Sequence, residues 1–179
     1  MRLTRWSQRR SDAGASAVEF ALVVPVLLLL VFGIIDYGMF FADTQAVNQG
    51  ARDGARQGSI GGTSFGTNTS CGMAPTGSTD IQALICQTKS AIGISGPVAV
   101  KVQFKTPGTD NNTTYTQGND LKVCVVGQRK SITGFTPYPS NGLMTTSVRI
   151  RIERVLSTPA ETAGTGSSFG STVDWSWCP

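Results

Sequence analysis

Residues that could carry acid–base or nucleophilic chemistry are scarce in this sequence. Its 179 residues include no histidine, so the commonest general base and every Ser–His or Cys–His pair are missing. Four acidic residues of the C-terminal half are scattered through polar segments without a pairing signal: Asp110, Asp120, Glu153 and Glu161. No glycine pattern typical of a phosphate-binding or dinucleotide-binding loop occurs. The sequence therefore predicts neither an enzyme nor a bound cofactor.

Four cysteines form the second set of reactive side chains, and all follow the apolar N-terminal stretch: Cys71, Cys86, Cys124 and Cys178. A zinc site would normally show paired Cys-x-x-Cys motifs or histidines, so no metal site is predicted. In an extracytoplasmic domain, an even set of cysteines indicates two disulfides, with three possible connectivities. Proximity in the sequence favours Cys71 with Cys86 and Cys124 with Cys178, and leaves the other two connectivities open.

The most informative residues lie at 14–20, Gly-Ala-Ser-Ala-Val-Glu-Phe, between a basic leader and an apolar run. A cut between Gly14 and Ala15 would create an amino group four residues before Glu19, on the same face of a helix. That cation would oppose the helix dipole, and the carboxylate would offset it. In an assembled bundle, Glu19 would instead meet the amine of a neighbouring subunit. The alternative is that Glu19 only marks the membrane edge.

This junction resembles the TadE-like family of pseudopilins, minor components of Tad (Flp) pilus systems. The resemblance implies cleavage by a prepilin peptidase after Gly14, with Ala15 as the new first residue and Glu19 and Phe20 as marker positions. Downstream, Pro25 and the stretches at 33–38 and 48–56 also resemble the family. The resemblance covers about residues 9 to 58.

The elements that position this junction begin with an uncharged run of sixteen residues, 20–35. At 1.5 Å per residue the run spans about 24 Å, less than the roughly 30 Å of hydrocarbon in a bilayer. Residues 15–18 and 37–41 supply the missing length, and Asp36 is expected near the headgroups. The sequence thus predicts one membrane span at about residues 20–42.

The apolar run has three other interpretations. A cleaved secretory signal would need a small-x-small site after the run, and residues 32–38 offer a poor one. A buried core helix or a peripheral amphipathic helix is disfavoured because the run is apolar on all sides.

The charge distribution indicates how the span is oriented. Residues 1–14 carry four arginines and one aspartate, so they hold three of the four net positive charges. Basic residues beside a span keep that end in the cytoplasm, which places the rest of the chain outside. After Gly14 no Lys/Arg run with interleaved aromatics occurs, so no nucleic-acid partner is predicted.

Beyond the span, small residues recur every fourth position in the continuing helix: Ala42, Ala46, Gly50, Gly54 and Gly58. This spacing keeps them on one face, where another backbone can approach closely. Each glycine costs about 1 kcal/mol of helix stability relative to alanine. We expect the four positions from 46 to 58 to be a packing face for a sheet or for neighbouring helices, with a fraying helix as the alternative.

The remaining chain predicts a small domain. Residues 80–92 have the spacing of a short amphipathic helix. Residues 98–105, 121–126 and 147–155 alternate between apolar and polar side chains, as strands of an antiparallel sheet do. The segment from 157 to 172 is rich in Ser, Thr and Gly and is expected at the surface, before a C-terminal end with two tryptophans.

These patterns predict an α+β fold: a long membrane-spanning helix that continues into a small pilin-like ectodomain with a short helix and about three antiparallel strands. The expected divisions are a cytoplasmic leader (1–14), the long helix (15–58), the extracytoplasmic domain (59–156) and the tail (157–179).

The expected function is that of a minor pilin or pseudopilin-like subunit in Tad pilus assembly. The subunit is expected in the cytoplasmic membrane, with incorporation into a surface pilus as a further option. Its expected partners are the membrane, a prepilin peptidase, other pilins or pseudopilins, and Tad membrane platform proteins. The alternative is a permanently anchored extracytoplasmic binding or adhesion module.

Overall fold

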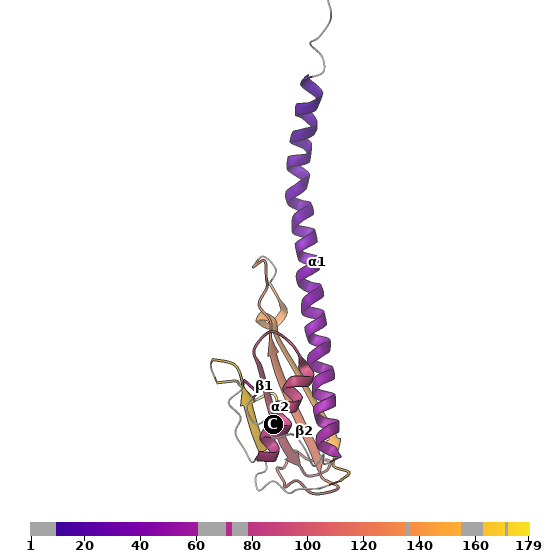
Figure 1. Cartoon of the computed structure of the whole chain (residues 1–179), viewed down its shortest axis with the longest axis vertical. Coiled ribbons are helices and arrows are strands. Elements are labelled where there is room, and N and C mark those ends of the chain that lie inside the picture. Colours follow the sequence, from indigo (N-terminus) through magenta and orange to yellow (C-terminus); the bar gives the residue numbers. More distant parts are fainter. Residues whose placement is uncertain (1–9, 61–70, 73–78, 135–136, 155–162, 171) are drawn as a thin grey trace, which may run out of the picture.

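The computed structural model describes residues 10–60, 71–72, 79–134, 137–154, 163–170 and 172–179. Most of the basic leader expected at 1–14, most of the connection between 59 and 78, and the first part of the expected tail lie outside the described residues. The described chain contains one long α-helix, one short α-helix, a 3₁₀ helix (η1, Pro139–Gly142) and a four-stranded antiparallel sheet (Figure 1). The predicted α+β class, with a long apolar N-terminal helix, is confirmed.

Helix α1 (Arg10–Ser59) has 50 residues and is about 75 Å long at 1.5 Å per residue. Its N-terminal half extends away from the folded domain, and its C-terminal half lies against it (Figure 1). Nearly all apolar side chains from 18 to 35 are exposed, whereas Val47, Ala51 and Ala55 are buried. These three residues recur every fourth position and therefore share one face of the helix.

The sheet has the strand order β3-β2-β1-β4, and every neighbouring pair is antiparallel. Its strands are β1 (Val98–Lys105), β2 (Asp120–Gln128), β3 (Leu143–Arg151) and β4 (Ala163–Ser167). β1 and β2 pair along their whole lengths, so the β1–β2 connection and the β2–β3 connection leave opposite ends of the sheet.

The sheet differs from the expected one in two respects. β4 is a fourth strand, and it lies in the segment that was expected to be a surface tail. Its sequence, Ala-Gly-Thr-Gly-Ser, carries no alternation of large apolar side chains, because glycines occupy its two buried positions. β3 ends at Arg151 rather than near 155, and Ile152 instead donates its N–H to the carbonyl of Asn119 at 2.7 Å.

One face of the sheet forms the hydrophobic core with both helices. Helix α2 (Thr79–Ile92) contributes Ile81, Leu84 and Ile85, and it lies against β1 and β4. The C-terminal half of α1 covers β2 and β3. The alternating valines of β1 and β2 fill the space between the layers, which explains why these two strands could be predicted from their period of two.

Candidate functional site

The residues of the expected processing site lie together near the N-terminal end of α1. Gly14, Ala15, Glu19 and Phe20 are all exposed, and Phe20 retains 70% of its accessible surface. A Cβ atom built on Gly14 would meet no heavy atom within 4 Å. The folded domain therefore leaves Gly14 uncovered.

Among the described residues, one helix is long and apolar enough to cross a membrane, and it runs from Gly14 to Ser59. The 21 residues from 15 to 35 contain one charged side chain, Glu19, and span about 31 Å, close to the roughly 30 Å of bilayer hydrocarbon. A single apolar helix followed by a folded domain fits a single-pass membrane protein.

The glycine-rich face of α1 packs against the chain's own domain. A Cβ on Gly50 would lie 2.8 Å from the Cα of Ile92, and one on Gly54 would lie 2.8 Å from Cγ2 of Thr88. Both contacts are with α2, whereas Gly58 faces Leu121 of β2. At these three positions the absence of a side chain lets α1 lie close to its neighbours.

Ala46 is half-buried at the start of the same face. The sequence left two kinds of partner open for this face, a sheet or neighbouring helices. In the structure the face packs on one of each from the same chain: helix α2 and strand β2.

Asp36 is at the centre of a set of contacts that the sequence did not predict. This residue has no exposed surface, although it interrupts an otherwise exposed apolar stretch of α1. Its carboxylate accepts hydrogen bonds from the hydroxyl of Ser131 at 2.8 Å, the hydroxyl of Thr133 at 2.5 Å and the backbone N–H of Ile132 at 3.2 Å. All three donors belong to the β2–β3 loop, residues 129–142, which rises along α1 (Figure 1).

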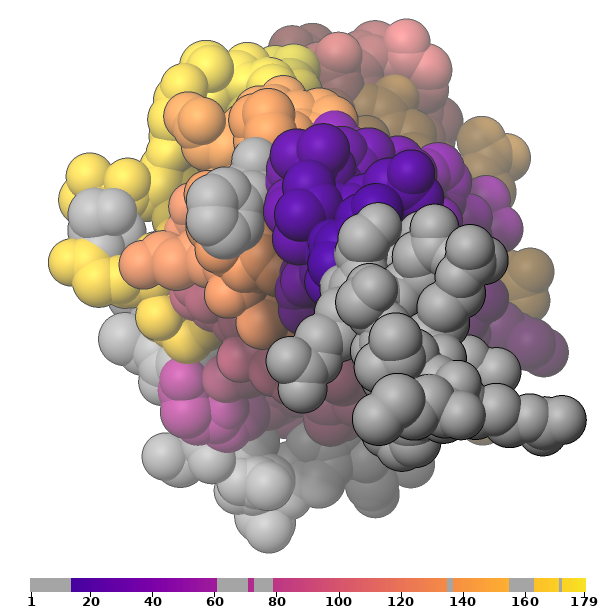
Figure 2. All heavy atoms as spheres, turned by 90° about the horizontal axis from the view of Figure 1, so that it is seen from above, coloured from indigo at the N-terminus to yellow at the C-terminus, as the bar shows by residue number. Residues whose placement is uncertain are grey.

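Aromatic contacts hold the same loop against α1. The ring of Tyr138 stacks on Phe40 with a centroid distance of 4.9 Å, and its hydroxyl donates to the backbone carbonyl of Asp36 at 3.1 Å. From the helix side, the hydroxyl of Tyr37 donates to the carbonyl of Pro137 at 3.2 Å. In the view from above, the orange loop residues lie beside the indigo helix (Figure 2).

An ion pair fixes the base of the loop. The guanidinium of Arg129 lies 2.5 Å from the carboxylate of Asp43, and both side chains are largely buried. The hydrogen bond that the guanidinium donates to Asp43 raises the pKa of Arg129, so Arg129 stays charged over the whole physiological range. The N–H of Arg129 also donates to the carbonyl of Gly142 at 3.0 Å, which closes the loop where β3 begins.

A sequence signal for this site does exist. Asp36, Phe40 and Asp43 follow the i, i+4, i+7 spacing and so share one face of α1. That polar and aromatic stripe requires partners, and the hydroxyl-bearing residues near 131–133 supply them from a segment almost a hundred residues away. Long-range pairings of this kind are not visible in local periodicity.

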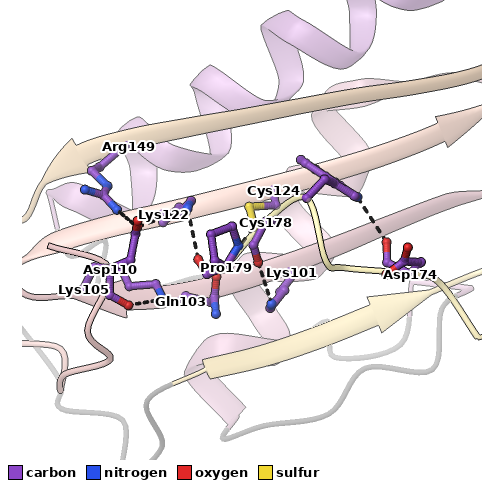
Figure 3. Close-up of a disulfide and its surroundings, with 11 residues drawn as sticks. Lys101, Gln103, Lys105, Asp110, Lys122, Cys124, Arg149, Asp174, Cys178 and Pro179 are labelled. Carbon is purple, nitrogen blue, oxygen red and sulfur yellow. Dashed lines mark hydrogen bonds and ion pairs between the residues drawn. A yellow bond between two sulfur atoms is a disulfide. The ribbon is translucent and has the colours of Figure 1, made fainter.

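The outer face of the sheet is covered by the C-terminal end of the chain. The structure pairs Cys124 with Cys178, and separately Cys71 with Cys86, as proximity in the sequence favoured. Figure 3 shows the C-terminal residues crossing the sheet, where Lys101 donates to the carbonyl of Cys178 at 2.9 Å. The Cys71–Cys86 bridge joins the preceding connection to α2.

Basic side chains gather beside this covering segment. The ammonium of Lys105 is buried and donates to the backbone carbonyl of Asp110 at 2.8 Å; burial is the main cause that lowers its pKa. The carboxylate of Asp110 contacts Lys122 at 3.4 Å and also Arg149 (Figure 3). The charge of Lys122 is the largest of the causes that lower the pKa of Asp110.

A shallow hollow of about 350 Å³ lies between the paired ends of β2 and β3 and the C-terminal residues 169–177. Phe169 and Trp177 supply apolar surface there, and Asp174 supplies a carboxylate. Within the part of the chain that the structure describes, no group of three or more His, Cys, Asp or Glu side chains is placed to hold a metal ion.

Comparison with known proteins identifies the N-terminal region. Residues 14–56 match the family model of the TadE-like proteins. No curated protein and no solved structure matches the chain. The matched segment begins at Gly14, continues through the apolar stretch and the residues that contact the β2–β3 loop, and ends where α1 packs on α2. The resemblance drawn from the junction at 14–20 is confirmed: this chain carries a TadE-like segment over residues 14–56.

Proposed function

We propose that this chain is a pseudopilin-like subunit that takes part in assembly of a Tad pilus. A prepilin peptidase removes residues 1–14 at the cytoplasmic face, and α1 then holds the subunit in the cytoplasmic membrane. The observation that carries the proposal is the TadE-like match over residues 14–56, which coincides with an exposed helix joined to a folded domain.

The chemistry of the two ends supports this orientation. Arginines are concentrated in the leader, which favours a cytoplasmic N-terminus. All four cysteines of the domain are paired in disulfides, which persist in oxidising compartments outside the cytoplasm.

The structure also limits which surface neighbouring subunits would use. The glycine face at 50–58 is occupied by the chain's own α2 and β2, so it is closed to another helix. The exposed apolar surface between 18 and 35, together with Glu19, remains for contact with other pilins or pseudopilins and with the Tad platform proteins. There Glu19 would pair with the new amino group of Ala15, in its own or a neighbouring subunit.

Intact-mass measurement tests the processing step. Co-expression with a prepilin peptidase should shorten the purified chain by the mass of residues 1–14, and Gly14→Ala should prevent this. Gly33→Ala is the matched control, because a Cβ at Gly33 also meets no heavy atom within 4 Å. Its chain should be cut like the unmodified one. An uncut chain in the presence of an active peptidase, or equal cutting of Gly14→Ala, would contradict the proposal.

A second candidate is a permanently anchored binding module, and the hollow lined by Phe169, Asp174 and Trp177 favours it. Such a module would stay in the membrane fraction when surface filaments are sheared from cells. The pilus-associated subunit would appear in the sheared filament fraction, or would be required for filaments to form.

A further inference from the structure

The β2–β3 loop lies at an unusual height for part of a water-soluble domain. Three of its residues, 131–133, bind the carboxylate of Asp36, so the tip of the loop lies beside the last turn of the apolar stretch. Figure 1 shows the loop extending along α1 well beyond the rest of the sheet, toward the N-terminal end of the helix.

The membrane depth of this tip follows from the length of the helix. If residues 15–35 fill the hydrocarbon, which is about 30 Å thick, Asp36 lies at its outer boundary. Headgroups add roughly 6 Å on each side of the hydrocarbon, or about four helical residues. Tyr37, which is exposed, then lies at headgroup depth, where aromatic side chains are enriched. The loop residues that bind Asp36 must lie in the same layer.

The composition of the tip suits that layer. Ile132 keeps 67% of its accessible surface exposed while its N–H is bonded to Asp36, and Lys130 beside it is also exposed. A single exposed isoleucine in water would need no explanation. At this depth, however, an exposed isoleucine would face lipid, and an exposed lysine ammonium would lie near lipid phosphates.

We infer that residues 130–134 form a second membrane contact, in which Ile132 enters the outer leaflet at the headgroup boundary and Lys130 binds a lipid phosphate. This contact rests on the proposed function to the extent that α1 must span the membrane. It also accounts for the buried state of Asp36, since a carboxylate at the edge of the hydrocarbon needs hydrogen-bond donors that water no longer supplies. With two attachment points, the whole subunit cannot rotate freely about the long axis of α1 in the membrane.

Spin-label accessibility measures this contact directly. The full-length chain carrying Ile132→Cys is labelled with a nitroxide and reconstituted into vesicles of phosphatidylethanolamine and phosphatidylglycerol. Collision rates are then compared for oxygen, which concentrates in lipid, and for a water-soluble nickel complex. All four native cysteines are paired, and peptide mapping without reductant verifies that each variant retains both bridges.

Two matched label sites calibrate the result. Asn111→Cys is exposed in the β1–β2 connection at the opposite end of the sheet, and Leu28→Cys is exposed in the middle of the apolar stretch. We expect the oxygen-to-nickel ratio at 132 to exceed that at 111 several-fold and to lie below that at 28. Adding Lys130→Gln should lower the ratio at 132 toward that at 111.

Each other outcome overturns the inference. A ratio at 132 equal to that at 111, with 28 in lipid, would leave the anchor intact and place the loop in water. Protection of 132 from both oxygen and nickel would indicate contact with a second copy of the chain instead of lipid. A water-accessible label at 28 would remove the membrane span itself, and with it both the loop contact and the proposed anchoring.

Discussion

The close approach of α1 and α2 at Gly50 makes the substitution Gly50→Ala a sharp test of how the long helix is joined to the domain. In an isolated helix this change would be favourable, because alanine exceeds glycine in helix propensity by about 1 kcal/mol. Here the added Cβ would lie 2.8 Å from both the Cα and the backbone N of Ile92. Neither atom belongs to a flexible side-chain end that could move aside.

The expected effect follows from these two opposing contributions. Non-bonded carbon atoms prefer a separation of about 3.5–4.0 Å, so α2 would have to move away by roughly 1 Å. Overpacking of this kind typically costs 1–3 kcal/mol, and the propensity gain offsets about 1 kcal/mol of it. We therefore expect Gly50→Ala to lower the free energy of unfolding of the domain by about 1 kcal/mol.

Urea unfolding of the full-length chain in detergent micelles, followed by tryptophan fluorescence, measures this change. With a slope of about 2 kcal/mol per molar urea, the midpoint should fall by about 0.5 M. Gly38→Ala is the control, since a Cβ there meets no heavy atom within 4 Å, and its midpoint should be unchanged or slightly higher. A Gly50→Ala midpoint equal to or above that of the Gly38→Ala control would refute the close packing of α1 on α2.

Three further predictions concern the loop contact, the disulfides and pH. Asp36→Ala should accelerate hydrogen exchange in the β2–β3 loop, because three donors lose their acceptor, whereas Asp53→Ala at an exposed position of α1 should not. Replacing both cysteines of Cys124–Cys178 by serine should lower the free energy of unfolding by about 4 kcal/mol, and replacing those of Cys71–Cys86 should lower it by about 3 kcal/mol, since the bridges close loops of 54 and 15 residues. The urea midpoint should therefore fall further in the Cys124–Cys178 variant than in the Cys71–Cys86 variant. The pKa of Asp110 lies below its ordinary value of 3.8, so its ion pairs stabilise the fold at any pH above 3.8, and this contribution is lost as the pH falls through the lowered pKa. The difference in urea midpoint between the unmodified chain and Asp110→Asn should therefore be constant from pH 7 to 5 and vanish in stronger acid.

Much of the fold follows from local patterns in the sequence. The uninterrupted apolar run predicts α1, although its side chains are exposed. The periods of 3.6 and 2 predict α2, β1 and β2, because these three elements bury large side chains at regular spacing. β4 could not be found in this way. Its buried positions are Gly164 and Gly166, so it joins the sheet through backbone hydrogen bonds and close packing, which leave no hydrophobic signal.

The candidate sites also differ in whether local sequence predicts them. The junction at 14–20 is a local motif, and it was sufficient to indicate the TadE-like segment. The role of Asp36 depends on a loop 95 residues further along the chain, and its burial emerges only when the sheet and the helix are assembled. The glycine spacing predicted a close approach, while the identity of the partner, α2, required the structure.

In the proposed function, the leader is removed at Gly14 so that the mature subunit can serve a Tad pilus. N-terminal sequencing of the protein recovered from cells that assemble the pilus, with the sheared filament fraction and the membrane fraction examined separately, tests it most directly. We predict a chain that begins at Ala15 in both fractions, and loss of surface filaments in cells that carry only Gly14→Ala. Protein that retains Met1 in the membrane fraction, together with unimpaired filaments in the Gly14→Ala cells, would contradict the account.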